Sequence, residues 1–316
     1  MASRVWPSGW HPGGLGWALA RNALADEIVV AGDRDGTVIG WASRGGHDIG
    51  ELHAQVDRGR ADVAAALVDW MVVRAPRSSG PKIAVWDGAG ELEAEVQGAG
   101  FAASSRREWA GMFRAVNGAE GDPRRTVAGY TIRAVRESAR ELEARVAVHR
   151  RAWRPASLPY VDGRSVNPEA ESSFTAEAYK AVRSTWLYDA ELDVVAVASD
   201  GELAACCTGW FDRATGVTEI EPLGVAPQHR RRGLAVARSL ELAARTEALG
   251  GSQVFLNTTP RDDYPAPAAA YTQAGFQLLE RATTYVLPLH DGQTRSGPAV
   301  TTAEANPSAV RQGGRV

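Results

Sequence analysis

The apolar positions of this chain follow one order of elements twice. Residues 27–33 and 37–43 are apolar stretches joined by Arg34-Asp35-Gly36, which is the pattern of a β-hairpin. Apolar side chains three and four positions apart predict helices, and short apolar runs predict strands. In the first half these rules give strands at 49–56, 81–87 and 108–116 and helices at 61–75 and 92–100.

The second half repeats this order. A strand at 127–135 and a helix at 137–153 precede a hairpin of strands 192–199 and 202–211, and a central strand covers 218–225. A helix begins after Gly233, and strands follow at 253–259 and 278–289. Self-similarity of this kind indicates an internal duplication. An unrelated α/β domain with the same order of elements is the alternative for the first half.

The repeat sets the expected domain organisation of an α/β (mixed α+β) protein. A chain of 316 residues is long enough to bury two separate cores. We expect a first domain at 1–116, a linker rich in Gly, Asn, Asp and Pro at 117–125, and a second domain at 126–290. Residues 291–316 lack apolar periodicity, which predicts a disordered tail.

The turn between the strand at 218–225 and the next helix carries the clearest chemical signal. Pro227 ends the strand because it has no N–H to donate, and Gly233 precedes the helical pattern. A helix start presents unpaired backbone N–H groups to an anion, and the segment Arg230–Arg232 adds positive charge. These features predict a polyphosphate site. Neither a G-x-x-x-x-G-K-[ST] nor a complete G-x-G-x-x-G motif is present.

The same turn resembles the acetyl-CoA loop of the GNAT acetyltransferase superfamily. The pattern V-x-P-x-x-[QR]-x-x-G-x-[GA] is filled by Val225, Pro227, Arg230, Gly233 and Ala235. Downstream, AAAYTQAGF is similar to the superfamily's Y-x-x-x-G-F. The resemblance covers roughly residues 126–289, and with the first half as a second copy the layout is similar to that of mycothiol synthase-like acetyltransferases.

This resemblance implies two tandem GNAT folds, each a twisted mixed sheet flanked by helices with a splayed central strand pair. It implies acetyl-CoA as co-substrate, without a metal. The residues implied to bind it are Leu223, Gly224, Val225, Arg230, Arg231, Arg232, Gly233, Leu234, Ala235 and Asn257. The family commonly has its asparagine seven positions before the tyrosine, where this chain has Tyr264, and Asn257 lies seven further upstream.

Three side chains are candidates for the chemistry. Tyr271 fits the family's tyrosine that protonates the departing thiolate, with a core aromatic as the alternative. Glu219 and Glu221 lie two apart on the central strand, hence on one face. Either could act as general base, with Glu221 the first choice because it is nearer the splay. The alternative is that both attract a cationic acceptor, aided by Asp262 and Asp263.

The first copy departs from the pattern at the corresponding turn. Only DRGRAD, residues 57–62, separates its strand from its helix, with an aspartate at either end where a phosphate should lie. We expect a degenerate GNAT-like domain there. In the second copy, Trp153, Tyr160 and Phe174 either line an acceptor pocket or cover the core.

Composition narrows the remaining classes. Lys and Arg number 35 against 38 Asp and Glu, so no global field attracts nucleic acid or an anionic membrane. No stretch reaches 18 uninterrupted apolar residues, and no His, Cys, Asp and Glu pattern has metal-ligand spacing. The adjacent Cys206 and Cys207 point to opposite faces of a strand and cannot join distant segments. A cytoplasmic setting fits.

Together these features predict an acetyl-CoA-dependent N-acetyltransferase acting on a primary amine of a small molecule, such as an amino sugar or another metabolite. Two alternatives stay open: a protein that binds acyl-CoA without turnover, and a protein or peptide N-acetyltransferase.

Overall fold

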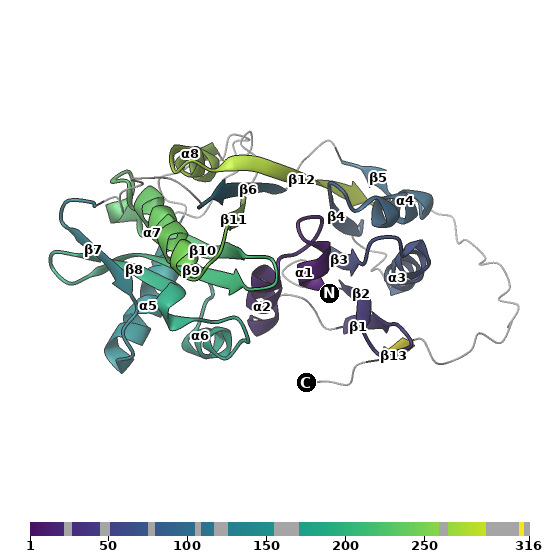
Figure 1. The fold of residues 1–316 in the computed structure, drawn as a ribbon, viewed down its shortest axis with the longest axis horizontal. Coiled ribbons are helices and arrows are strands. Elements are labelled where there is room, and N and C mark those ends of the chain that lie inside the picture. Colours follow the sequence, from purple (N-terminus) through teal and green to yellow (C-terminus); the bar gives the residue numbers. More distant parts are fainter. Residues whose placement is uncertain are drawn as a thin grey trace, which may run out of the picture. The chain divides into compact units, whose positions relative to one another are not determined.

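The computed structural model describes residues 1–21, 27–44, 51–74, 80–104, 109–116, 126–154, 171–258, 265–288 and 310–312. The chain divides into two compact units, neither of which is continuous in sequence (Figure 1). Unit 1 contains residues 1–10, 22–107 and 282–316, and unit 2 contains residues 11–21 and 108–281. The predicted linker at 117–125 lies outside the described residues, and the boundaries at 116 and 126 stay a prediction.

Unit 1 is a sheet with helices packed on it. Its helices are α1 (Ala2–Val5), α3 (Ala61–Arg74) and α4 (Gly90–Gly98). Its strands are β1 (Glu27–Gly32), β2 (Val38–Arg44), β3 (Glu51–Val56), β4 (Lys82–Trp86), β5 (Ala102–Ala103), the second half of β12 (Gln277–Val286) and β13 (Val310–Gln312). Strand β13 pairs with β1, so these three residues of the predicted disordered tail are ordered as a strand.

Unit 2 has the same design on a larger scale. Its helices are α2 (Pro12–Ala20), α5 (Ala139–Ala152), α6 (Ala176–Arg183), α7 (Leu234–Ala248) and α8 (Pro265–Gln273), with short 3-10 turns at Ala190–Leu192 and Pro227–His229. Its strands are β6 (Trp109–Ala115), β7 (Tyr130–Ala134), β8 (Asp193–Ala198), β9 (Leu203–Asp212), β10 (Val217–Val225), β11 (Gln253–Thr258) and the first half of β12.

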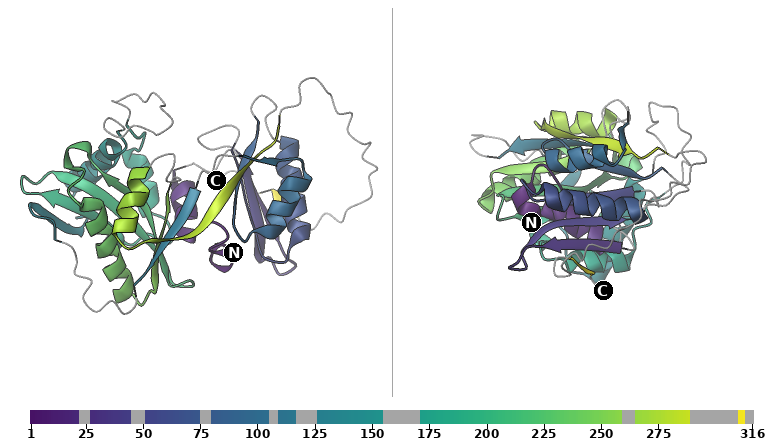
Figure 2. Two further views of the ribbon diagram at one scale, coloured as in Figure 1. Left: turned by 90° about the horizontal axis from the view of Figure 1, so that it is seen from above. Right: turned by 90° about the vertical axis from the view of Figure 1, so that its right-hand side faces the viewer.

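Each unit contains a parallel strand pair beside antiparallel ones. The pair is β3 with β4 in unit 1 and β10 with β11 in unit 2, and in each case the connection is a helix, α3 or α7. The strand beside β11 is β6, whereas the strand beside β4 is β12, the long strand in yellow-green in Figure 2. The predicted α/β class and mixed sheets are therefore confirmed.

Two layers of helices enclose the sheet of unit 2. Cys207 packs in a core cluster with Val236 and Leu242 of α7, and Cys206 packs in another cluster with Val148 of α5. Because adjacent residues of a strand point to opposite faces, α5 and α7 cover opposite faces of the sheet. Both cysteines are free and fully buried, as the sequence predicted for neighbouring strand positions.

Candidate active site

Strands β10 and β11 separate part-way along their length. Their parallel pairing runs from Val217 and Gln253 to Glu219 and Phe255 and then stops, although β10 continues to Val225 against β9. On its other side β11 pairs with β6 along its whole length, from Gln253 to Thr258. The split leaves one side of β10 without a strand partner along Leu223, Gly224 and Val225, the residues expected to lie beside the acyl donor.

A local irregularity in β10 accompanies the split. The register against β9 shifts between Ile220 and Leu223, so one extra residue of β10 is accommodated there. Pro222 lies inside this bulge and has no N–H for a ladder. Proline within a strand is a signal that sequence reasoning could have used to locate the bulge.

The turn after β10 leads directly into an uncapped helix. Gly233 occupies the N-cap position of α7 with φ 81°, and no side chain caps the helix. The first helical backbone bond is Ala237 N–H to Gly233 O, so the N–H groups of Leu234 and Ala235 precede it. Arg231 (φ 61°) and Arg232 are exposed on this turn. The arrangement is suited to an anion.

Arg230 lies on the same turn but contacts backbone. Its guanidinium donates to the carbonyls of Val225 (3.2 Å), Ala152 (3.0 Å) and Arg154 (2.6 Å). These bonds join the turn to the end of β10 and to the end of α5. The guanidinium therefore positions the turn in this structure, next to the exposed charges of Arg231 and Arg232.

Glu219 is buried at the start of helix α2. Its Oε2 accepts a hydrogen bond from Gly14 N–H at 2.5 Å and lies 3.2 Å from His11 Nδ1, while its Oε1 accepts from Asn257 Nδ2 at 3.4 Å. A Cβ at Gly14 would lie 2.9 Å from this carboxylate, so glycine is needed for the close approach. Asn257, expected at the cofactor, thus contacts Glu219.

Glu221 is partly buried and lacks such contacts. No described residue donates a hydrogen bond to its carboxylate, and Trp210 Nε1 donates to its backbone carbonyl. Burial and the neighbouring Glu219 raise the pKa of Glu221 to about 8, although Arg21 acts in the opposite direction. A carboxyl group with this pKa is suited to exchange a proton with an amine near neutral pH.

Tyr271 lies in the core of unit 2, on α8. Its ring is 9 % exposed and lies 6.0 Å from the ring of Phe276. The phenol is one of the groups that act electrostatically on Arg238, a residue of α7 that the sequence reading did not single out. Tyr271 and Arg238 thus lie near one another behind the split.

Arg238 is fully buried without a carboxylate partner. Its Nη2 donates to the carbonyl of Gly224 at 2.9 Å and its Nε to the carbonyl of Leu234 at 3.4 Å, while Nη1 has no hydrogen-bond partner in the described part of the chain. Burial lowers its pKa, which Cys207, Cys206 and Tyr271 partly oppose. A buried guanidinium with a spare donor is a costly arrangement, and such groups gather at functional sites.

Comparison with known proteins agrees with this geometry. Residues 163–276 match the model of the Acetyltransferase (GNAT) family. No curated protein matches this chain. Residues 163–276 belong to the GNAT family.

Solved structures show the same fold over most of the chain. A GCN5-related N-acetyltransferase from Sphaerobacter thermophilus is 20 % identical, with a TM-score of 0.56, and the match covers 85 % of this chain and 83 % of that one. A GNAT acetyltransferase from Colwellia psychrerythraea is 14 % identical with TM-score 0.56, covering 90 % and 94 %. A tandem GNAT protein from the clavulanic acid biosynthesis pathway is 13 % identical with TM-score 0.54, covering 92 % and 94 %. The domain at residues 163–276 is thus that of an acetyltransferase family.

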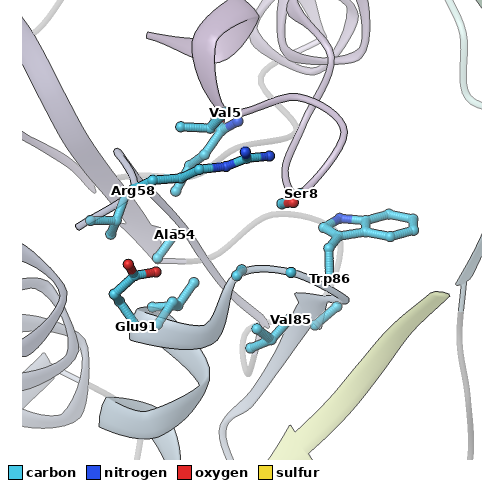
Figure 3. A pocket seen from close by; sticks show the side chains of 13 residues that line it. Val5, Ser8, Ala54, Arg58, Val85, Trp86 and Glu91 are labelled. Carbon is cyan, nitrogen blue, oxygen red and sulfur yellow. The ribbon is translucent and has the colours of Figure 1, made fainter. Parts of the chain in front are cut away.

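Two parallel strands of unit 1 also separate, and other residues of unit 1 fill the space beyond the separation. Strands β3 and β4 pair only at Glu51–Lys82 and Leu52–Ile83 before they separate. Figure 3 shows the space beyond, where Val5 and Ser8 of the N-terminal segment lie beside residues of β3 and β4. The cavity that remains is about 20 Å³, which is close to the volume needed for one water molecule.

Acidic side chains lie at the turn between β3 and α3 of unit 1. Glu91 accepts a hydrogen bond from Gly59 N–H at 2.7 Å, in the turn after β3. At the start of α3, hydrogen bonds from Arg60 and from the backbone N–H groups of Val63 and Asp62 lower the pKa of Asp62 to about 2. The donors that a GNAT turn would offer to a diphosphate therefore already have carboxylate acceptors.

An aromatic group lies on the α5 side of β10. His149 stacks on Trp153 with ring centroids 4.3 Å apart and lies 4.2 Å from Phe174. Burial lowers the pKa of His149 to about 2, and Arg145 and Arg21 add to the effect, so this ring is neutral. Phe174 is buried in the core, whereas Trp153 is 43 % exposed and covers Gly224. Tyr160, Asp262 and Asp263 lie outside the described residues.

The described residues contain neither a membrane-spanning helix nor a cluster of metal-ligating side chains. No helix there is long and apolar enough to cross a membrane. No group of three or more His, Cys, Asp or Glu side chains there could hold a metal ion.

Proposed function

We propose that unit 2 is an acetyl-CoA-dependent N-acetyltransferase that modifies the primary amine of a small molecule. The observation that carries this proposal is the arrangement along β10. Glu221 lies at the split from β11, the unpaired side of the strand follows, and the uncapped start of α7 comes directly after it. A proton acceptor, an unpaired strand side for the acyl donor and an anion site therefore follow one another in the order that direct acyl transfer requires.

The described residues fit acetyl-CoA as the co-substrate. Backbone N–H groups of Gly233, Leu234 and Ala235 would hold the diphosphate, with Arg231 and Arg232 adding charge. Leu223, Gly224 and Val225 would lie along the pantetheine arm. When bound, acetyl-CoA supplies an activated thioester. The residues of the chain bind it, orient it and move protons.

Glu221 would act first by accepting a proton from the acceptor ammonium, directly or through a water. The freed amine nitrogen bonds to the thioester carbon, the carbon–sulfur bond breaks, and the second amine proton leaves for solvent. Tyr271 would donate its phenolic proton to the sulfur and regain one from solvent. Arg238 would stabilise the negative charge that develops on oxygen and sulfur, because its guanidinium is buried beside Tyr271.

The test is thiol release from acetyl-CoA by the full-length protein with a panel of amines, with the acetylated product identified by mass spectrometry. We expect release with at least one small amine, and a loss of about 10²-fold or more in kcat for Glu221→Gln and Tyr271→Phe. CoA binding without thiol release for every amine would instead support a protein that senses acyl-CoA.

A further inference from the structure

Arg21 carries a positive charge that lies over aromatic rings at the end of helix α2. It follows the last residue of α2, and its guanidinium carbon lies 5.0 Å from the centre of the Trp17 ring and 5.9 Å from that of Phe174. Among the described residues no carboxylate forms an ion pair with it. Aromatic faces alone hold this cation, and such contacts are weaker than a bidentate carboxylate.

Glu221 is the acidic group that acts electrostatically on Arg21. Burial lowers the pKa of Arg21 and the charge of Glu221 raises it, and Arg21 in turn acts on Glu221. The two charges therefore interact, although they are too far apart for an ion pair. A series of contacts joins their surroundings. Arg21 lies over the Trp17 ring, the Trp17 and Trp210 ring centroids are 6.4 Å apart, and Trp210 Nε1 donates to the backbone carbonyl of Glu221.

Helix α2 fixes this separation. Its first turn is attached to β10 by the hydrogen bond from Gly14 to Glu219, and Arg21 follows its last turn. Trp17 of the same helix packs against Trp210 and Phe174.

We propose that the acceptor is a zwitterion, an amino acid or a molecule with an amino acid headgroup, whose carboxylate pairs with Arg21 while its amine faces Glu221. This inference rests on the proposed function of unit 2. The planar guanidinium matches a carboxylate through two parallel hydrogen bonds.

The same arrangement disfavours a simple polycation. A fixed guanidinium near the amine site repels a second positive charge on the acceptor, so a diamine would lose more by repulsion than it gains from Glu221. His149, the nearby titratable ring, is neutral and adds no competing charge. Glu219 and Glu221 alone would favour any cationic amine. With Arg21 nearby, the expected acceptors are amines that also carry a carboxylate.

The test compares matched acceptors with the full-length protein. One pair is phenylalanine and phenylalanine amide, and the other is lysine and cadaverine. In each pair only the first compound has a carboxylate. The quantity measured is kcat/KM, from thiol release. We expect the carboxylate-bearing member to be preferred about 10- to 100-fold, and Arg21→Met to remove that preference through KM. Arg213→Met is the matched control, because Arg213 lies 5.7 Å from the Phe211 ring on the turn between β9 and β10.

Equilibrium binding distinguishes a failure of this inference from a failure of the proposed acetyltransferase function. Calorimetric titration of the same compounds in the presence of CoA should show tighter binding of the zwitterion to the wild type than to Arg21→Met, whether or not acetyl transfer occurs. Equal affinity or equal kcat/KM for the two members of each pair overturns the inference, as does an equal loss for both members in Arg21→Met. Absence of turnover together with Arg21-dependent binding would overturn only the acetyltransferase proposal.

Discussion

Glu219 closes the first turn of helix α2, since its Oε2 accepts a hydrogen bond from the backbone N–H of Gly14 at 2.5 Å. A carboxylate at a helix N-terminus interacts favourably with the helix dipole. Glu221, two residues further along β10, has no such contact and is the carboxyl group with the raised pKa. The two glutamates therefore differ in role: Glu219 attaches α2 to the sheet, and Glu221 is the proposed base.

The first prediction concerns the pH dependence of transfer. Because a base must be unprotonated, kcat/KM should rise with pH through about 8, the pKa of Glu221, and then level off. Glu219→Gln removes a negative charge that raises this pKa, so its profile should move to lower pH. Glu221→Gln should lose this rise and about 10²-fold or more of the activity. A wild-type profile that is flat between pH 6 and 9 would exclude Glu221 as the base.

The second prediction concerns stability. Glu221 ionises near its ordinary value of 4.5 in the unfolded chain and near 8 in the folded one, so the unfolded state binds fewer protons between these values. The free energy of unfolding should therefore fall as pH rises from about 5 to 8. Glu221→Gln should not show this fall and should gain about 1 kcal/mol or more relative to the wild type by pH 8. Thermal melts of both proteins across this range provide the measurement.

The third prediction compares two glycines at opposite ends of α7. Gly233 and Gly250 have φ values of 81° and 80°, so valine, which rarely adopts this region, causes similar backbone strain at either site. Gly233 precedes the proposed diphosphate site, and a Cβ at Gly250 meets open space. We expect Gly233→Val to weaken CoA binding at least about 10-fold, with Gly250→Val unchanged. Equal CoA affinity in the two variants would place the diphosphate elsewhere.

The fourth prediction contrasts two buried arginines. Arg145 donates to Asp193 at 2.9 Å and to Thr208 at 3.0 Å, so Arg145→Met leaves a buried carboxylate without its cation and should destabilise unit 2 by about 3–5 kcal/mol. Arg238 has no such partner. Arg238→Met should leave stability equal or higher, while kcat falls about 10-fold or more. Denaturant unfolding and thiol release measure the two effects, and unchanged kcat in a folded Arg238→Met protein would remove this residue from the proposed chemistry.

The fifth prediction concerns stoichiometry. Val5 and Ser8 lie in the space where β3 and β4 separate, and Glu91 and Asp62 accept the hydrogen bonds of the turn after β3. Unit 1 should therefore not bind CoA, and CoA should bind once per chain. Calorimetric titration should give one site, and Gly233→Val should weaken that same site. A second site that persists in Gly233→Val would mean that the N-terminal segment leaves unit 1 when CoA is present.

Local patterns predicted most elements of the fold. The hairpin of β1 and β2, the strand–helix boundary at Gly233 and the helices α3, α5 and α7 follow from apolar periodicity and turn residues, which act over a few positions. The pairing of β6 with β11 and of β12 with β4 could not be read from these patterns. A strand's own sequence specifies which of its faces is apolar, and any neighbour with a matching face satisfies it.

The residues of the candidate site also fall into those that sequence patterns could locate and those that they could not. The turn at Gly233 and the acids of β10 were visible because their neighbours in sequence define their geometry. His11, Gly14 and Arg21 were not, since they lie about 200 positions before Glu219 and Glu221. The segment HPGG did hold a usable signal, because proline at the first helical position and glycines permit a helix to start close to another backbone.

The sequence by itself determined where β10 ends, where α7 begins and which backbone groups between them are left for an anion, because these depend on proline, glycine and helical geometry over about ten residues. Only the tertiary structure decided which of the two glutamates is hydrogen-bonded to helix α2, and that the charge of Arg21, about 200 positions earlier, acts on the other glutamate. Charge and burial act through space, so the pKa of Glu221 depends on groups that adjacent positions in the sequence cannot specify.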